Sequence, residues 1–224
     1  MVLKVYGILL KEYGRQGWWP ILDISENKFI YSPLFSYKEK NEEEKFEISI
    51  GAILTQNTSW KNVKPALFNL KKNNLLNKNK LQKISHNELA QLIKSAGYYN
   101  QKAKKIIAFA NFDSEITREN LLSIWGIGEE TADSILLYAY NKPYFVIDAY
   151  TKRIFSRLGL IKNTASYNEI KDFFENNLKK QKNKVKLYKE YHALIVAHAK
   201  NFCRKKPLCR DCIIKRYCSF YHNI

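Results

Sequence analysis

The sequence has no cysteine before position 203, little acidic charge and no long apolar segment. No apolar run approaches the roughly 20 residues that a membrane span requires, so we expect no membrane insertion. Aspartate and glutamate number 21 against 38 lysines and arginines, and the formal net charge is +17. This imbalance favours a polyanionic partner such as DNA, RNA or an anionic membrane surface, although a lysine-rich proteome would give a similar excess.

All four cysteines lie near the C-terminus, with the spacing C-x5-C-x2-C-x5-C: Cys203, Cys209, Cys212 and Cys218. Four thiolates so close in sequence are expected to converge on one metal centre. Zinc sites usually pair two C-x2-C knuckles across a longer gap. A single C-x2-C between two longer arms instead favours a [4Fe-4S] cluster, with zinc as the alternative.

The cysteine pattern also bears on the compartment. Small secreted proteins usually have an even number of cysteines spread along the chain, which pair as disulfides. In this chain all four cysteines lie between positions 203 and 218, so no cysteine remains to form a disulfide elsewhere. The first ten residues contain no small-residue cleavage site, so we expect no signal peptide. A reducing, intracellular location in the cytoplasm or nucleoid is therefore expected.

Helical periodicity extends over most of the chain and predicts an all-α fold. The apolar stripe of an amphipathic helix recurs in four segments: His86–Gly97, Tyr99–Phe112, Glu129–Tyr140 and Lys184–Lys200. Ser166 and Glu169 form a capping box before a further helix. The apolar run Tyr144–Ile147 has no partner run, so it is interpreted as an extended connector. Residues 1–40 are aromatic-rich and are interpreted as irregular.

Two of the predicted helices are joined through Gly126-Ile127-Gly128, which Trp125 precedes. Glycines permit a tight turn, and the backbone N–H groups there, with the next helix N-terminus, can bind a phosphate. Further on, Asp148 directly follows the apolar connector and is expected to cap a helix. Such an acid is expected to be partly desolvated, which would raise its pKa and suit it to catalysis. Taken alone, each feature is also explained as a plain turn or a plain cap.

In their order along the chain, these motifs resemble the endonuclease III superfamily of helix-hairpin-helix DNA glycosylases, from about Gly51 to Cys218. The segment Gly51–Thr58 is similar to the family's early helix, whose glutamine, here Gln56, fills the hole left by a flipped base. Asp148 stands where the family has its essential aspartate. The cysteines stand where it binds its cluster, although endonuclease III has x6 in the first spacing.

The resemblance implies two helical lobes with DNA and the flipped base between them. Residues 41–142 would form a six-helix barrel domain containing the hairpin. Residues 143–224 would form the C-terminal helices and the iron–sulfur cluster loop, and residues 1–40 would pack with this cluster domain. The implied DNA contacts are Gln56, Trp125, Gly126, Ile127, Gly128 and Lys152.

The chain departs from the bifunctional members of this family at one position. Those members place a lysine two residues after the second hairpin glycine, where it forms a Schiff base with the sugar. This chain has Glu130 there, and a carboxylate cannot form an imine. We therefore expect a monofunctional glycosylase in which Asp148 activates water and stabilises the cationic sugar.

Aromatic residues before position 50 suggest the substrate. Gly17-Trp18-Trp19-Pro20 and Phe46 resemble the 3-methyladenine-DNA glycosylase branch, in which a tryptophan and a phenylalanine, here Trp19 and Phe46, sandwich the base. Aromatic faces attract an electron-poor alkylated purine. We assign Trp18, Trp19, Pro20, Phe46 and Glu130 to this pocket.

The expected function is therefore excision of an alkylated purine from double-stranded DNA by a monomer without an obligate protein partner. One alternative is a monofunctional glycosylase for mismatched thymine, uracil or an oxidised base. The other is a non-catalytic DNA-binding protein that retains the scaffold.

Overall fold

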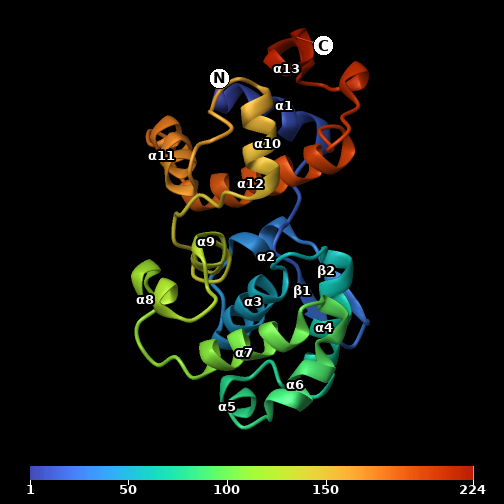
Figure 1. Ribbon diagram of the computed structural model, residues 1–224, viewed down its shortest axis with the longest axis vertical. Helices are drawn as coiled ribbons and strands as arrows, with labels where there is room; N and C mark the ends of the chain where they lie inside the picture. Colours follow the sequence, from blue (N-terminus) through green and yellow to red (C-terminus); the bar gives the residue numbers. More distant parts are fainter. Residues whose placement is uncertain (224) are drawn as a thin grey trace. The chain divides into compact units, whose positions relative to one another are not determined.

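The computed structural model describes residues 1–223, which fall into two compact units (Figure 1). Unit 1 comprises Met1–Trp18, Ser32–Tyr37 and the residues from Pro143 onward. Unit 2 comprises Trp19–Tyr31 and Lys38–Lys142. The N-terminal 40 residues are thus shared between both units, whereas the sequence assigned all of them to the cluster domain.

Unit 2 is helical apart from one small hairpin. Its elements are β1 (Ile21–Asp23), β2 (Lys28–Ile30), α3 (Glu42–Leu54), α4 (Trp60–Lys72), α5 (Lys78–Leu81), α6 (His86–Leu92), the 3-10 turn η1 (Lys94–Ala96), α7 (Tyr99–Ala110), α8 (Arg118–Ser123) and α9 (Glu129–Tyr138). The central helix is α3, which contacts α4, α7 and α9. Every α3 residue from Glu47 to Leu54 is buried, so this helix forms the core of the unit.

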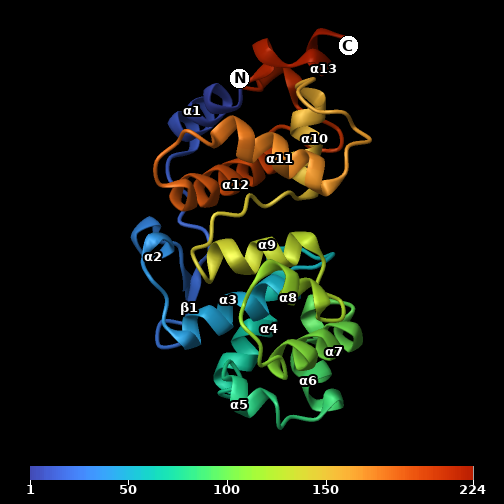
Figure 2. The same ribbon diagram turned by 90° about the vertical axis from the view of Figure 1, so that its left-hand side faces the viewer.

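Unit 1 is built around its longest helix. Its elements are α1 (Val2–Tyr13), α2 (Pro33–Tyr37), α10 (Ala149–Arg157), α11 (Tyr167–Leu178), α12 (Lys184–Asn201), the 3-10 turns η2 (Cys209–Asp211) and η3 (Lys215–Tyr217), and α13 (Ser219–His222). Figure 2 shows α12 in contact with α1 and α10. Aromatic rings fill the core, where Phe145 and Phe174 stack with centroids 4.2 Å apart and Tyr191 lies edge-on to both.

The all-α prediction is confirmed, and so are the capping box at Ser166 and Glu169 and the extended connector before Asp148. The prediction of an irregular N-terminus is wrong. Val2, Val5 and Leu9 are buried on one face of α1 at helical spacing. The strands β1 and β2 pair antiparallel, and Asn27 in the turn has a φ of 50°. No helix within residues 1–223 is long and apolar enough to cross a bilayer.

Candidate active site and metal centre

The glycine hairpin of unit 2 joins α8 to α9 and is held closely by two side chains. Gly126 has a φ of 82°, and a Cβ there would lie 2.6 Å from the side chain of Lys105. Only glycine satisfies both the left-handed backbone and the close approach. The Gln56 amide donates to the carbonyl of Gly126 at 3.1 Å and to Oγ1 of Thr131 at 2.9 Å. The predicted hairpin and Gln56 therefore lie together.

Cations from α7 complete this surface. Lys105 Nζ donates to Oε1 of Gln56 at 2.5 Å, and Lys104 Nζ lies 4.5 Å from the ring centroid of Trp125. Trp125 is 49% exposed, whereas Ile127 is buried beneath the turn. Trp125 and Ile127 were predicted from the sequence, whereas Lys104 was interpreted as part of a solvated helix face and Lys105 was not assigned, because helical spacing alone does not indicate a partner on another element.

The first turn of α9 carries two carboxylates. Gly128 is the N-cap, and Glu129 and Glu130 follow it, in favourable interaction with the helix dipole. Glu130 is exposed, while Glu129 lies 3.7 Å from Arg118, which binds the buried Asp133 at 2.7 Å. Glu130 is thus an exposed acid directly after a hairpin whose own residues are held by Gln56 and Lys105.

Tyr98 was assigned no role from the sequence. It caps the N-terminus of α7 in a left-handed conformation with a φ of 46°, and it is 70% exposed. A non-glycine residue in this region costs free energy, and bulky side chains rarely adopt it. The backbone therefore presents a large aromatic ring to solvent at an energetic cost. In the sequence, this exposed cap is indicated only by the segment Gly97-Tyr98-Tyr99, which joins two predicted helices.

Asp148 of unit 1 is the N-cap of α10, as predicted. Its Oδ1 accepts hydrogen bonds from the backbone N of Thr151 at 2.7 Å and from Oγ1 of Thr151 at 2.8 Å. Its Oδ2 lies 3.5 Å from Nε2 of His192, which projects from α12. The side chain is only 11% exposed. From the sequence, His192 was expected only as part of the apolar stripe of α12, and its contact with Asp148 was not predicted.

The direction of the Asp148 pKa differs from the expectation. Burial by itself raises the pKa of this carboxyl, as we expected from the sequence. The hydrogen bond and charge of His192 and the two hydrogen bonds from Thr151 outweigh burial, and the net pKa is below its ordinary value. The side chain is therefore a buried carboxylate that stays ionised at neutral pH.

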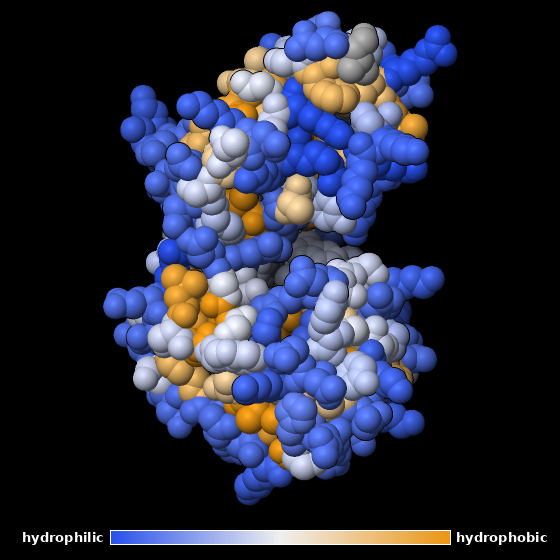
Figure 3. All heavy atoms as spheres, viewed as in Figure 1, coloured by the Kyte–Doolittle hydropathy of each residue, from blue (hydrophilic) through white to orange (hydrophobic). Residues whose placement is uncertain are grey.

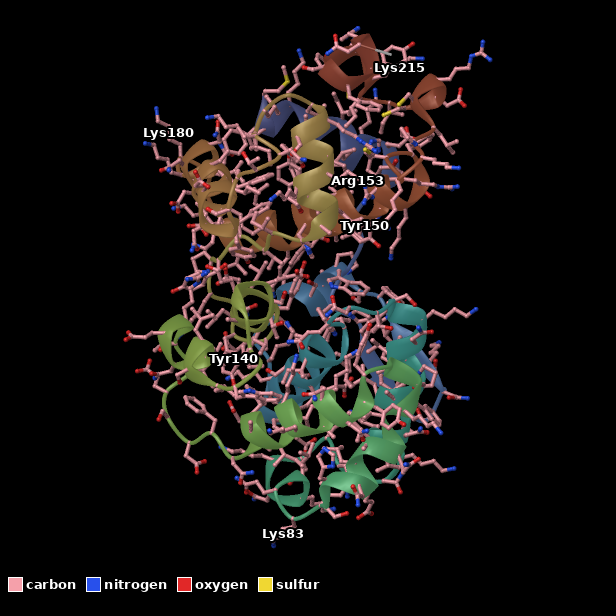
Figure 4. All side chains as sticks on the ribbon, in the orientation of Figure 1. Lys83, Tyr140, Tyr150, Arg153, Lys180 and Lys215 are labelled. Carbon is pink, nitrogen blue, oxygen red and sulfur yellow. The ribbon has the colours of Figure 1, made fainter. Side chains whose placement is uncertain are left out.

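A basic groove runs beside α10. Its volume is about 630 Å³, and it is lined by Ala149, Lys152, Arg153, Ser156, Arg157, Asn163, Ser219, Phe220 and Asn223. No acidic residue is among them. Figure 4 shows Tyr150 and Arg153 on the same helix, α10. Figure 3 shows a strip of hydrophilic side chains over the region of α10, with apolar side chains beside it. Lys152 and Arg153 each donate one hydrogen bond to a backbone carbonyl, of Ala165 and Cys203 respectively, which fixes their direction and leaves further N–H donors.

The four cysteines line one apolar pocket, together with Ile154, Leu158, Phe202, Pro207, Ile214 and Phe220. None forms a disulfide. Two side chains reach their sulfurs: Arg157 Nη1 lies 3.3 Å from Sγ of Cys203, and His198 Nε2 lies 3.4 Å from Sγ of Cys212. Burial and the neighbouring thiols raise the pKa of Cys212 to about 11. In residues 1–223 no three His, Cys, Asp or Glu side chains converge closely enough to hold a single metal ion.

The aromatic residues of the predicted base pocket have different surroundings. Trp19 is 5% exposed and packs with ring centroids 5.4 Å from Trp60 and 5.5 Å from Tyr138. A Cβ at Gly51 would lie 3.0 Å from the Trp19 ring. Phe46 instead stacks on Phe109 and lines a cavity of about 310 Å³. Trp60, which the sequence analysis did not assign, is thus a ring neighbour of Trp19.

The other two assigned residues flank Trp19 in sequence. Pro20 is buried, and Trp18 is half-buried with its carbonyl accepting a hydrogen bond from the Ser36 hydroxyl. Trp18 belongs to unit 1 and Trp19 to unit 2, so the chain passes between the units at this peptide bond.

A family model for HhH-GPD superfamily base excision DNA repair proteins matches residues 50–180. The chain belongs to this superfamily. The matched segment contains Gln56, the glycine hairpin and Asp148, and the resemblance inferred from the sequence is confirmed. The protein is a base excision DNA glycosylase of the HhH-GPD type.

Relatives of this glycosylase align over most of its length. It is 47% identical to a candidate DNA repair glycosylase of Methanocaldococcus jannaschii, over 97% of this chain and 96% of that one. It is 30% identical to endonuclease III of Sulfolobus acidocaldarius, over 79% and 82% of the two chains. Among solved structures, the 3-methyladenine DNA glycosylase MagIII of H. pylori, with bound 1,N6-ethenoadenine, superposes with a TM-score of 0.71. That enzyme is 29% identical, and the match covers 89% of this chain and 97% of that chain.

Proposed function

We propose that this glycosylase hydrolyses the N-glycosidic bond of an alkylated purine, such as 3-methyladenine, flipped out of double-stranded DNA, and that it does not cleave the strand. The observation that carries this proposal is the buried, ionised carboxylate of Asp148, combined with Glu130 at the position where a lysine nucleophile would stand.

Asp148 acts on water and on charge. When the C1′–N bond breaks, its electron pair neutralises the cationic base, and the sugar becomes cationic. Oδ2 accepts a proton from the attacking water as the C1′–O bond forms, and the negative charge stabilises the sugar cation. Because Thr151 occupies Oδ1, the second oxygen is the one available for this proton. An N-alkylated purine is already cationic and needs no acid to leave, which suits a carboxylate with a lowered pKa.

Glu130 removes the route to strand cleavage. A Schiff base at C1′ requires an amine, and β-elimination of the 3′ phosphate follows from that intermediate. The carboxylate of Glu130 cannot provide it. We therefore assign water as the nucleophile and an abasic sugar as the product.

The paired tryptophans supply the preference for an alkylated base. Trp19 and Trp60 form an aromatic corner with an interplanar angle of 84°, and Trp60 Nε1 donates to the hydroxyl of Tyr31. A cationic purine gains more from an aromatic face than a neutral one does. A 29% identical enzyme is a 3-methyladenine DNA glycosylase that binds a modified adenine, which supports the same substrate class here. On this basis Trp60, rather than Phe46, is the proposed partner of Trp19.

Each unit contacts DNA through a surface of its own. In unit 2 the hairpin amides, Trp125, Gln56 and the exposed Tyr98 contact the duplex. In unit 1 the groove beside α10 offers Lys152 and Arg153 to backbone phosphates. The net charge of +17 favours this partner at long range.

The cysteine pocket is proposed to hold a [4Fe-4S] cluster, and its residues fit this group. Each iron of the cube takes one cysteine, so the four ligand sulfurs are further apart than those around one zinc ion. The four cysteines line one pocket, and Nη1 of Arg157 and Nε2 of His198 lie 3.3 Å and 3.4 Å from two of their sulfurs. Cys203, Cys209, Cys212 and Cys218 would hold the cluster, which would supply redox-active iron when bound. Hydrolysis is assigned to Asp148.

The deciding experiment is base release from a panel of duplexes that contain 3-methyladenine, 1,N6-ethenoadenine, uracil or thymine opposite guanine, or an oxidised pyrimidine. We expect release of alkylated adenines and an intact strand until hot alkali is added. Release of thymine or uracil alone would refute the substrate class, and release of no base would refute the enzyme. A covalent enzyme–DNA adduct after borohydride reduction would refute the monofunctional assignment.

A further inference from the structure

His198 is fully buried between α1 and one cysteine of the metal centre. Its Nδ1 lies 3.0 Å from the hydroxyl of Tyr13, and its Nε2 lies 3.4 Å from Sγ of Cys212. A neutral imidazole carries one N–H and one lone pair, so the partner of one nitrogen decides what the other can do. The question is therefore which nitrogen carries the proton.

The chemistry of the two partners decides the tautomer. A metal-bound thiolate has only lone pairs and can only accept a hydrogen bond. The Tyr13 hydroxyl can donate, and burial raises its pKa to about 12, so it keeps its proton. The consistent arrangement is a directed chain in which the Tyr13 O–H donates to Nδ1 and Nε2–H donates to the Cys212 sulfur. The opposite tautomer would place a lone pair against the thiolate.

A second donor acts on a second sulfur. Arg157, at the end of α10, directs Nη1 to Sγ of Cys203 at 3.3 Å, and the same guanidinium donates to the carbonyls of Arg204 and Lys205. These backbone contacts hold the guanidinium in place. Two of the four proposed ligands thus accept an N–H···S bond from a side chain whose orientation is fixed by a further partner.

We propose that His198 and Arg157 raise the reduction potential of the iron–sulfur cluster, and that Tyr13 sets the tautomer of His198 required for this effect. The inference rests on the proposed cluster. Reduction adds negative charge that is shared by the ligand sulfurs, so N–H···S bonds stabilise the reduced form more than the oxidised form. Both side chains are positioning residues that act through the cysteines, away from the scissile bond.

The test measures the cluster potential directly. The purified holoprotein is titrated electrochemically, with the cluster followed by its visible absorption and by electron paramagnetic resonance. The variants are H198L, which removes the donor, H198Q, which keeps an amide N–H, and Y13F, which leaves the imidazole in place. The matched control is H222L, because His222 is a histidine of the same C-terminal segment whose Nε2 faces the carbonyl of Arg216 at 3.4 Å.

We expect the potential to fall in H198L and in Y13F, and to stay near the wild-type value in H198Q and H222L. A wild-type potential in an H198L protein with full iron content would overturn the proposal. If H198L takes up no iron, Y13F decides, because it preserves the buried ring, and an unchanged potential in Y13F would overturn the role of Tyr13 and the assigned tautomer.

Arg157 has its own matched control in Arg153. Both project from α10, but Arg153 directs its Nε to the carbonyl of Cys203 at 2.8 Å rather than to the sulfur. R157M and R153M each remove one positive charge, and only R157M should lower the potential clearly. Equal shifts in the two variants would refute the sulfur contact and leave a general charge effect. Absence of iron from the wild-type protein would refute the cluster itself, whatever the base-release panel shows.

Discussion

Replacement of Asp148 by asparagine should slow catalysis strongly and leave the fold intact. Asparagine is as good an N-cap as aspartate, and its Oδ1 can accept the same two hydrogen bonds from Thr151. The change removes the charge that faces His192 and the oxygen that takes the proton from water. Loss of a general base typically costs about 10²–10⁴-fold in rate. We expect D148N to lose base release in this range under single-turnover conditions.

D148A is the matched variant that separates capping from catalysis. Alanine cannot accept the Thr151 bonds, and loss of an N-cap costs about 1 kcal/mol. In a chain of this size that corresponds to a fall of about 2–4 °C in Tm, measured by circular dichroism. D148N should melt close to the wild type. If D148N released 3-methyladenine within tenfold of the wild-type rate at pH 7, the mechanism would be wrong; if it melted as low as D148A, the cap geometry would be wrong.

Two further predictions concern residues of unit 2. Y98G should raise the free energy of unfolding by about 1 kcal/mol, because glycine adopts the φ of 46° without strain, and should weaken duplex binding in a fluorescence anisotropy titration; unchanged affinity would refute the DNA contact. Lys102 is buried with Nζ donating to the carbonyls of Leu54 and Ala96, and burial lowers its pKa to about 8. Above pH 8 the unfolded chain holds this proton more tightly than the folded one, so wild-type stability should rise with pH relative to K102M, by up to about 1 kcal/mol per pH unit. Parallel stability profiles between pH 8 and 9.5 would contradict that assignment.

Much of the fold follows from local patterns in the chain. The capping box at Ser166 and the N-cap at Asp148 use short-range chemistry, since the side chain bonds an N–H three residues away. Helix α1 also has a local signal in the sequence, the apolar stripe Val2, Val5 and Leu9. The aromatic and glycine residues that follow it led to the wrong prediction of an irregular N-terminus. The hairpin of β1 and β2 was missed because each strand has three residues, too few for a period of two to be distinguished from chance.

The site was only partly predictable, because its contacts join distant parts of the chain. Asp148 and the cysteines carry their own chemical signal in residue type and position. His192 contacts Asp148 although the two are 44 residues apart in sequence. Its position in the middle of α12 predicts only that it belongs to the buried face of that helix. His198 and Tyr13 are separated by 185 residues. Trp60 is a neighbour of Trp19 because α4 packs against β1, a consequence of tertiary packing that no spacing rule encodes.

The pKa of Asp148 shows how such a distant contact changes the chemistry. From the sequence alone, desolvation was the only influence that could be argued, and it predicted a raised pKa for the carboxyl of Asp148. The structure adds Thr151 and His192, which reverse the net shift. A group with a lowered pKa in the folded state stabilises the protein above its unfolded pKa near 4 and loses that contribution as the pH falls through the folded value. Base release should therefore show no loss attributable to Asp148 between pH 8 and 5. A loss of base release between pH 8 and 5 that is present in the wild type and absent from the residual activity of D148N would contradict the lowered pKa of Asp148.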